Sequence, residues 1–124
     1  MTMQMTQPLA LSAGTLTGDR VVNLQNEDIG KVEEIMIDIN TGRVAYVVIS
    51  FGGILGIGSK FFAVPWSAIR VDTDHECFVM DAHKELLENA PGFDKNNWPS
   101  TPNGQWYHDI YKYYEQEPYW LSKR

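Results

Sequence analysis

The sequence has a single cysteine, few basic residues and no long hydrophobic segment. Cys77 is the only cysteine among 124 residues, which excludes an intrachain disulfide and a cysteine-cluster metal site. It stands in the apolar stretch Cys77-Phe78-Val79-Met80, which predicts a buried thiol. Ten scattered Lys and Arg face sixteen Asp and Glu, giving a net charge of -6. This balance disfavours nucleic acid or an anionic lipid surface as the main partner.

Membrane and export signals are also missing. No run approaches the roughly 20 apolar residues of a membrane-spanning helix. Residues 1–14 lack the basic segment and apolar stretch of a secretory signal. We therefore expect a cytoplasmic protein with no membrane span.

Motifs for catalysis and for metal binding are absent from the sequence. There is no G-x-S-x-G, and Cys77 lies in no nucleophile motif. The acidic residues and histidines between positions 72 and 83 do not have the spacing of H-E-x-x-H or of an EF-hand loop. We interpret them as a solvated turn and expect no enzyme activity, no cofactor and no metal.

Apolar residues make up 44% of the chain, which is enough for a hydrophobic core that needs no disulfide or metal to stabilise it. The strongest pattern runs from Arg43 to Trp66: an apolar strand at 44–51, a glycine-rich loop, a second strand at 60–64 and a Pro-Trp stop. Further strands are expected at 20–24 and 31–39, with a hairpin joining 70–72 to 77–80. Short helical turns are expected at 66–69 and 84–89.

The strand at 31–39 contains an irregularity. Ile35, Ile37 and Ile39 alternate with polar or flexible residues, as in a half-buried strand whose isoleucines face the core. Val32 falls on the opposite parity, with Glu33-Glu34 between. A β-bulge near Glu33-Glu34 would bring Val32 and Ile35 to one side, and such bends suit a small barrel.

The glycine-rich loop has the spacing of a phosphate-binding loop but not its chemistry. In Gly53-x4-Gly58, Ser59-Lys60 reverses the required order, and the next segment is a strand rather than a helix. Nucleotide binding is therefore disfavoured. Exposing the loop's apolar side chains would be costly, so they either cover a barrel end or contact a partner. They are Ile54, Leu55 and Ile57.

The C-terminal part is rich in aromatic residues. Eight of the 27 residues between Trp98 and Arg124 are Trp or Tyr. A helix is expected at 105–116, ended by Pro118. Its aromatic side chains predict packing on the chain's own barrel or on a second subunit, and an aromatic ligand cleft is a further interpretation. They include Trp106, Tyr107, Tyr111 and Tyr114.

Three elements in order carry a family resemblance: Gly30-Lys31-Val32, Thr41-Gly42-Arg43-Val44, and Phe61-Phe62-Ala63-Val64-Pro65-Trp66. Together with Asp38 and Tyr46-Val47-Val48 they resemble the PRC-barrel domain family over residues 15–93. The resemblance implies a mainly β fold, a small, strongly bent antiparallel β-barrel used for binding or assembly. It supplies no shared catalytic set.

These observations define the predictions that follow. Residues 1–14 form a flexible arm, 15–93 the PRC-barrel-like domain with short helices, and 94–124 an aromatic extension packed on the barrel or on a second subunit. The expected function is a non-enzymatic binding or assembly module that forms a homodimer and docks on another protein. The alternatives are a small-ligand or metal-binding accessory protein and, third, an RNA-processing or ribosome-assembly factor. Partner contacts are predicted at Ile54, Leu55, Ile57, Trp106, Tyr107, Tyr111 and Tyr114.

Overall fold

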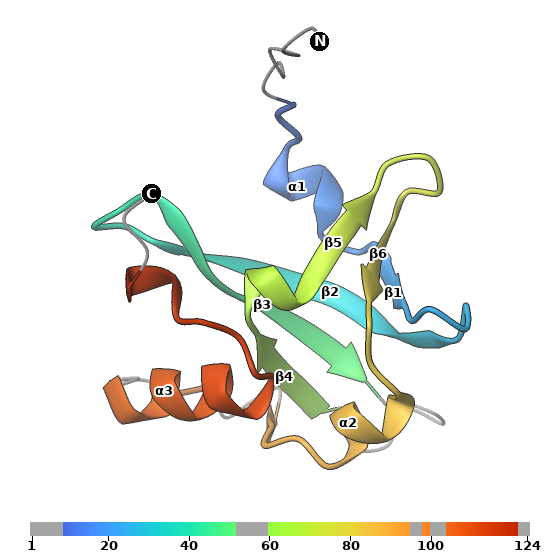
Figure 1. The fold of residues 1–124 in the computed structure, drawn as a ribbon. Coiled ribbons are helices and arrows are strands. Elements are labelled where there is room, and N and C mark those ends of the chain that lie inside the picture. Colours follow the sequence, from blue (N-terminus) through green and yellow to red (C-terminus); the bar gives the residue numbers. More distant parts are fainter. Residues whose placement is uncertain (1–8, 52–59, 95–97, 100–103, 122–124) are drawn as a thin grey trace, which may run out of the picture.

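A computed structural model describes residues 9–51, 60–94, 98–99 and 104–121. Within these ranges seven strands form one sheet (Figure 1). The strands are β1 (Arg20–Val22), β2 (Asp28–Asp38), β3 (Arg43–Phe51), β4 (Lys60–Val64), β5 (Ile69–Asp72), β6 (Cys77–Met80) and β7 (Phe93–Asp94). The helices are α1 (Ala13–Leu16), α2 (Lys84–Glu88) and α3 (Gly104–Tyr113), with single 3₁₀ turns η2 (Trp66–Ala68) and η3 (Tyr119–Leu121).

The strand order is β5-β6-β1-β2-β3-β4-β7, and the sheet stays open at β5 and β7. This confirms the mainly β, strongly bent fold with short helices. Pairing is antiparallel as expected, except that β1 and β6 run parallel. The exception arises because β6 returns at the end of the domain to lie beside its first strand.

Bulges bend the long central hairpin of β2 and β3. The register shifts between Val32 and Glu34, which confirms the bulge predicted near Glu33-Glu34. Val32 is fully buried and Ile35 half-buried. The bulge therefore lets a charged pair remain in a strand that still covers the core.

The prediction that Ile37 and Ile39 face the core is wrong. Ile37 is 48% exposed and Ile39 is 91% exposed. A second register shift lies between Met36 and Ile37, where β3 contributes one extra residue, Ala45, to the pairing. β2 ends at Asp38, so Ile39 lies in the turn that carries the hairpin beyond the core.

The main core lies between the bent sheet and the helices. Its fully buried side chains include Ile29, Val47, Ile49, Phe78 and Leu87. From the C-terminal part, α3 adds Ile110 and Tyr111 to the same cluster, and Tyr114, directly after α3, also joins it. A smaller, separate cluster contains Val22, Cys77 and Val79, and so the prediction of a buried Cys77 thiol is confirmed.

Candidate functional site

The aromatic extension is joined to the sheet domain by three tyrosine hydroxyl groups. Each donates a hydrogen bond to an acceptor far away in the sequence. The pairs are Tyr111 Oη to the Ala45 carbonyl at 2.7 Å, Tyr113 Oη to the Leu86 carbonyl at 2.5 Å, and Tyr119 Oη to Asp38 Oδ2 at 2.6 Å. The acceptors belong to β3, α2 and β2, so the extension is tied to three separate elements.

The hydrogen bond from Tyr111 provides a donor for the Ala45 carbonyl, which lies at an interruption of the sheet pairing. In the β2–β3 pairing Met36 stands opposite Tyr46 and Ile37 opposite Val44, so Ala45 is the extra residue of a bulge. The pairing of β3 with β4 begins only at Val47. A buried carbonyl without a partner is costly, and Tyr111 Oη supplies the missing donor. Burial raises the pKa of Tyr111 to about 12, so its hydroxyl keeps its proton.

Tyr119 and Asp38 join η3 to the tip of the β2–β3 hairpin. Asp38 also accepts the Asn40 amide at 2.9 Å and so supports the hairpin turn. The bond from Tyr119, followed by the one from the Asn40 amide, lowers the pKa of Asp38. Burial raises the pKa of Tyr119, and Asp38 raises it further. The Arg43 guanidinium lies 5.2 Å from the Tyr119 ring centroid, within reach of a cation–π interaction.

Aromatic rings fill the space between α3, η3 and the hairpin. Trp106 meets the Tyr46 ring edge-on, with centroids 5.2 Å apart. Trp120 contacts Tyr107 at 5.9 Å and Tyr111 at 5.2 Å in the same edge-on manner. Such arrangements are favourable for aromatic pairs beyond their buried area. The rings therefore set the position of η3 on α3.

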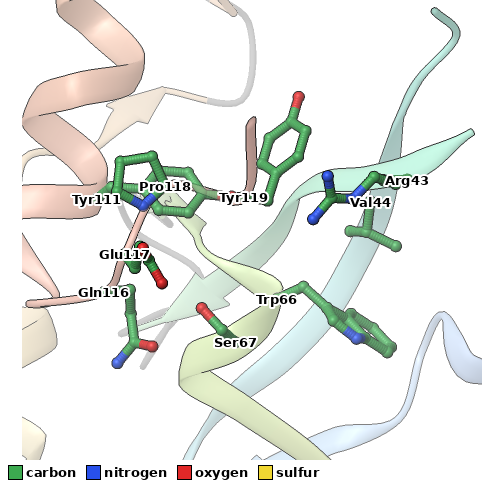
Figure 2. Close-up of a pocket in the computed structure, with 9 residues that line it drawn as sticks. All are labelled: Arg43, Val44, Trp66, Ser67, Tyr111, Gln116, Glu117, Pro118 and Tyr119. Carbon is green, nitrogen blue, oxygen red and sulfur yellow. The ribbon is translucent and has the colours of Figure 1, made fainter. Parts of the chain in front are cut away.

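A cavity of about 570 Å³ opens between the extension, the start of β3 and η2. Figure 2 shows that Arg43 and Glu117 lie on opposite sides of this space. The rings of Tyr111, Tyr119 and Trp66 form its walls, and Ser67 and Gln116 add polar groups. No sequence pattern indicated that these polar groups converge, because they come from three segments that meet only in the folded chain.

A second hollow, of about 370 Å³, lies between the hairpin tip and the extension. It is lined by residues of β2 and the following turn together with Tyr46, Tyr107 and Tyr119. Large apolar side chains are exposed on both of these segments. They are Ile37 and Ile39 of the hairpin, and Trp120 and Leu121 of η3, exposed by 48%, 91%, 37% and 62%. Among the described residues only Leu9, Leu11 and Leu24 are further exposed large apolar side chains.

The predicted contact residues divide into three groups. Ile54, Leu55 and Ile57 lie outside the described residues. Tyr111 and Tyr114 are buried in the core of their own chain, and the Tyr114 hydroxyl has no hydrogen-bond partner among the described residues. Trp106 and Tyr107 are half-buried in the aromatic packing. Contact with a partner stays a prediction for this set, and the division at residues 14 and 93 stays one as well.

Sequence reasoning missed Ile37, Ile39, Trp120 and Leu121 as surface residues. Their apolar character favoured burial. The signal available was Asn40-Thr41-Gly42, since a turn directly after Ile39 leaves little chain to cover it.

The described ranges contain neither a metal-ligand cluster nor a membrane-spanning helix. Residues 9–51, 60–94, 98–99 and 104–121 contain no group of three or more His, Cys, Asp or Glu that could hold a metal ion. Over these ranges no helix has the length and apolar character to cross a membrane.

The fold and the docked extension define a bent, open β-domain with an aromatic C-terminal cover. The family model of the PRC-barrel domain matches residues 10–87, well over half of the chain. The chain therefore belongs to the PRC-barrel family.

The remaining comparisons concern curated proteins and solved structures. No curated protein matches the chain. Among solved structures, the chain is similar to a putative 16S ribosomal RNA processing protein, RimM, from Pseudomonas aeruginosa, with 11% identity and a TM-score of 0.44. The match covers 67% of this chain and 50% of that one, so the chain spans about half the length of that structure.

Proposed function

We propose that this PRC-barrel chain is a non-enzymatic assembly module that self-associates and docks on another protein. One observation supports the proposal that the chain docks on another protein. Four of the seven large apolar side chains exposed among the described residues lie on the hairpin tip and η3. The bond from Tyr119 to Asp38 holds these two segments together. Exposed apolar surface gathered in this way is typical of a protein-binding surface.

Contacts within the chain also hold this surface in place. The hairpin tip is braced by Tyr119 and Arg43, and η3 by the rings of Tyr107 and Tyr111. A surface that is already ordered loses little conformational entropy when a partner binds. We name the exposed set of Ile37, Ile39, Trp120 and Leu121 the hairpin–η3 surface.

Replacing Ile39 and Leu121 by serine tests the docking. The I39S/L121S variant should keep its stability, because both side chains are exposed, but should lose most of its partner binding. Burying an aliphatic side chain contributes about 1.5–3 kcal/mol, so partner capture should fall by at least about tenfold. The immobilised full-length chain is exposed to lysate of its source cells, and bound proteins are quantified by mass spectrometry.

The matched control is Leu9→Ser, which changes an equally apolar and exposed side chain away from the hairpin–η3 surface. It should capture the same proteins as the wild type. Equal capture by all three chains would show that docking does not use this surface. Thermal melting of each variant establishes that the fold is intact.

A second candidate function, small-ligand binding, is favoured by the 570 Å³ cavity of Figure 2. Its volume lies in the usual range for ligand pockets, about 300–1,000 Å³. The aromatic walls suit a planar body, and Arg43 and Glu117 suit groups of opposite charge. An aromatic amino acid has this combination.

Two-dimensional NMR tests this candidate with tryptophan, phenylalanine and tyrosine as the probes. Binding should shift the indole N–H signal of Trp66, assigned through the Trp66→Phe variant. The indole signal of Trp98 serves as the internal reference, because Trp98 does not line the cavity and packs against Phe61 and Phe93, which do not line it either. An unchanged Trp66 signal at millimolar probe would exclude this ligand class.

A further inference from the structure

The smaller apolar cluster marks a second face of the sheet. Val22, Cys77 and Val79 form this cluster, whereas their neighbours Val21 and Phe78 belong to the main core. Since side chains alternate along a strand, the cluster lies on the sheet face turned away from the main core. Figure 1 shows its strands β5, β6 and β1 side by side, away from α3. This outer face forms a groove of about 440 Å³.

Strand register places the side chains of this face in two rows across four strands. The pairings of β5 with β6, β6 with β1 and β1 with β2 set the order. In the order β5, β6, β1, β2, the first row is Asp72, Cys77, Arg20 and Lys31, and the second row is Arg70, Val79, Val22 and Asp28. Each row thus has an acidic residue at one end and a basic residue at the other. The direction of this polarity is opposite in the two rows.

Such an array is complementary to itself. Consider two copies whose outer faces meet across a two-fold axis parallel to the strands. The strands of the second copy then run across the face in the reverse order, and each row lies opposite the same row of the other copy. β5 of one copy then faces β2 of the other. Asp72 meets the second copy's Lys31, and Arg70 meets the second copy's Asp28. In the middle of the rows, Val79 meets the second copy's Val22, and Arg20 meets the second copy's Cys77. A two-fold interface requires this kind of self-complementarity.

We propose that the outer face of β5, β6, β1 and β2 binds the same face of a second copy of the chain. The proposal rests on the self-association proposed above and names its surface. The net charge of -6 makes two copies repel each other at long range. Contact therefore needs a surface where opposite charges meet locally, and this face supplies four such contacts in a dimer.

The charges and the apolar floor favour a second copy over an acidic partner of another kind. An acidic partner would pair with Arg20, Arg70 and Lys31 but would also meet Asp28 and Asp72. A second copy places a basic residue opposite the acidic end of each row and an acidic residue opposite the basic end. Leu24, which is exposed and lines the groove, adds apolar surface beside the rows.

The existing partners of these charges leave them accessible. Lys31 Nζ lies 3.9 Å from Glu33, with the lysine side chain 57% exposed. Asp72 bonds to the exposed His75 ring at 2.9 Å. Exposed pairs of this kind contribute little on their own, so they can exchange for a contact across the interface.

Two charge reversals, made separately and then mixed, test the proposal. Arg70→Glu sets an acidic side chain against Asp28 at both symmetric contacts, and Asp28→Lys sets a basic one against Arg70. Each variant alone should dimerise at least about tenfold more weakly than the wild type. When the two variants are mixed, both contacts regain opposite charges. The mixture should therefore form a heterodimer of near wild-type affinity, measured by sedimentation velocity and native mass spectrometry.

The possible outcomes are distinct. Weakened homodimers with a restored heterodimer support the interface. A wild-type dimer that neither reversal weakens would overturn this interface while leaving self-association in place. A wild-type chain that stays monomeric at high micromolar concentration would overturn both. Should Asp28→Lys unfold, because Asp28 also accepts the Gly30 amide at 3.2 Å, Arg70→Glu and Lys31→Glu test one row each. Each should weaken the dimer at least about tenfold, and an unweakened dimer would overturn the interface.

Discussion

Gly30→Ala is expected to destabilise the domain by about 3 kcal/mol or more. Gly30 has a φ of +149°, and a Cβ added there would lie 2.6 Å from the Ser50 carbonyl oxygen and 2.7 Å from Ile49 Cγ2. Both neighbours belong to β3, whose position is set by pairing on either side. The strand cannot move without disturbing the main core. Urea unfolding followed by tryptophan fluorescence measures the effect.

Gly42→Ala is the matched control for this substitution. Gly42 also has a positive φ, +78°, but an added Cβ would meet nothing within 4 Å. Only the strain of a left-handed backbone remains, about 1–2 kcal/mol. Equal losses for the two variants would show that close packing against β3 does not explain the requirement for Gly30.

Tyr111→Ala is expected to cost about 3–5 kcal/mol and to release the extension from the sheet. The substitution removes a buried ring from the main core and leaves the Ala45 carbonyl of the β3 bulge without its donor. Tyr111→Phe keeps the ring and should cost only about 1–3 kcal/mol. Hydrogen exchange should show faster exchange over residues 104–114 in the alanine variant. Urea unfolding gives the free energies.

Lys112→Ala serves as the control on the same helix, because Lys112 is exposed. It should change stability by no more than about 0.5 kcal/mol. If Tyr111→Ala were as mild as this control, the extension would be held by contacts other than the Tyr111 side chain.

Local patterns in the sequence predicted most of the fold. Alternating apolar residues marked β2, a continuous apolar run marked β3, and Pro65-Trp66 marked the end of β4. The parity conflict between Val32 and Ile35 revealed the bulge that the register confirms. These features depend on side-chain period and on the backbone limits of Gly and Pro, which act over a few residues. The same local reasoning failed at Ile37 and Ile39, because the second bulge has no parity conflict to reveal it.

The candidate site was predicted only in part. An aromatic extension that needs cover follows from composition alone, and Tyr111 was among the residues named for it. Its acceptor, Ala45, could not be foreseen, because an alanine carbonyl has no signature in the sequence. The bond spans 66 residues, and that from Tyr119 to Asp38 spans 81. Neither exists until the sheet and the extension have packed.

Short-range sequence patterns are sufficient to predict a bent β-domain of the PRC-barrel kind and a buried Cys77. The spacing of buried residues and the backbone limits of Gly and Pro depend on a few neighbouring residues, so they can be predicted without knowing the tertiary structure. The parallel pairing of β6 with β1, in contrast, follows from long-range packing and has no local signal. That pairing brings Arg70 and Asp28, from strands at opposite ends of the outer face, into one row. The outer face depends on which distant segments become neighbours, because those segments are brought together only when the core packs.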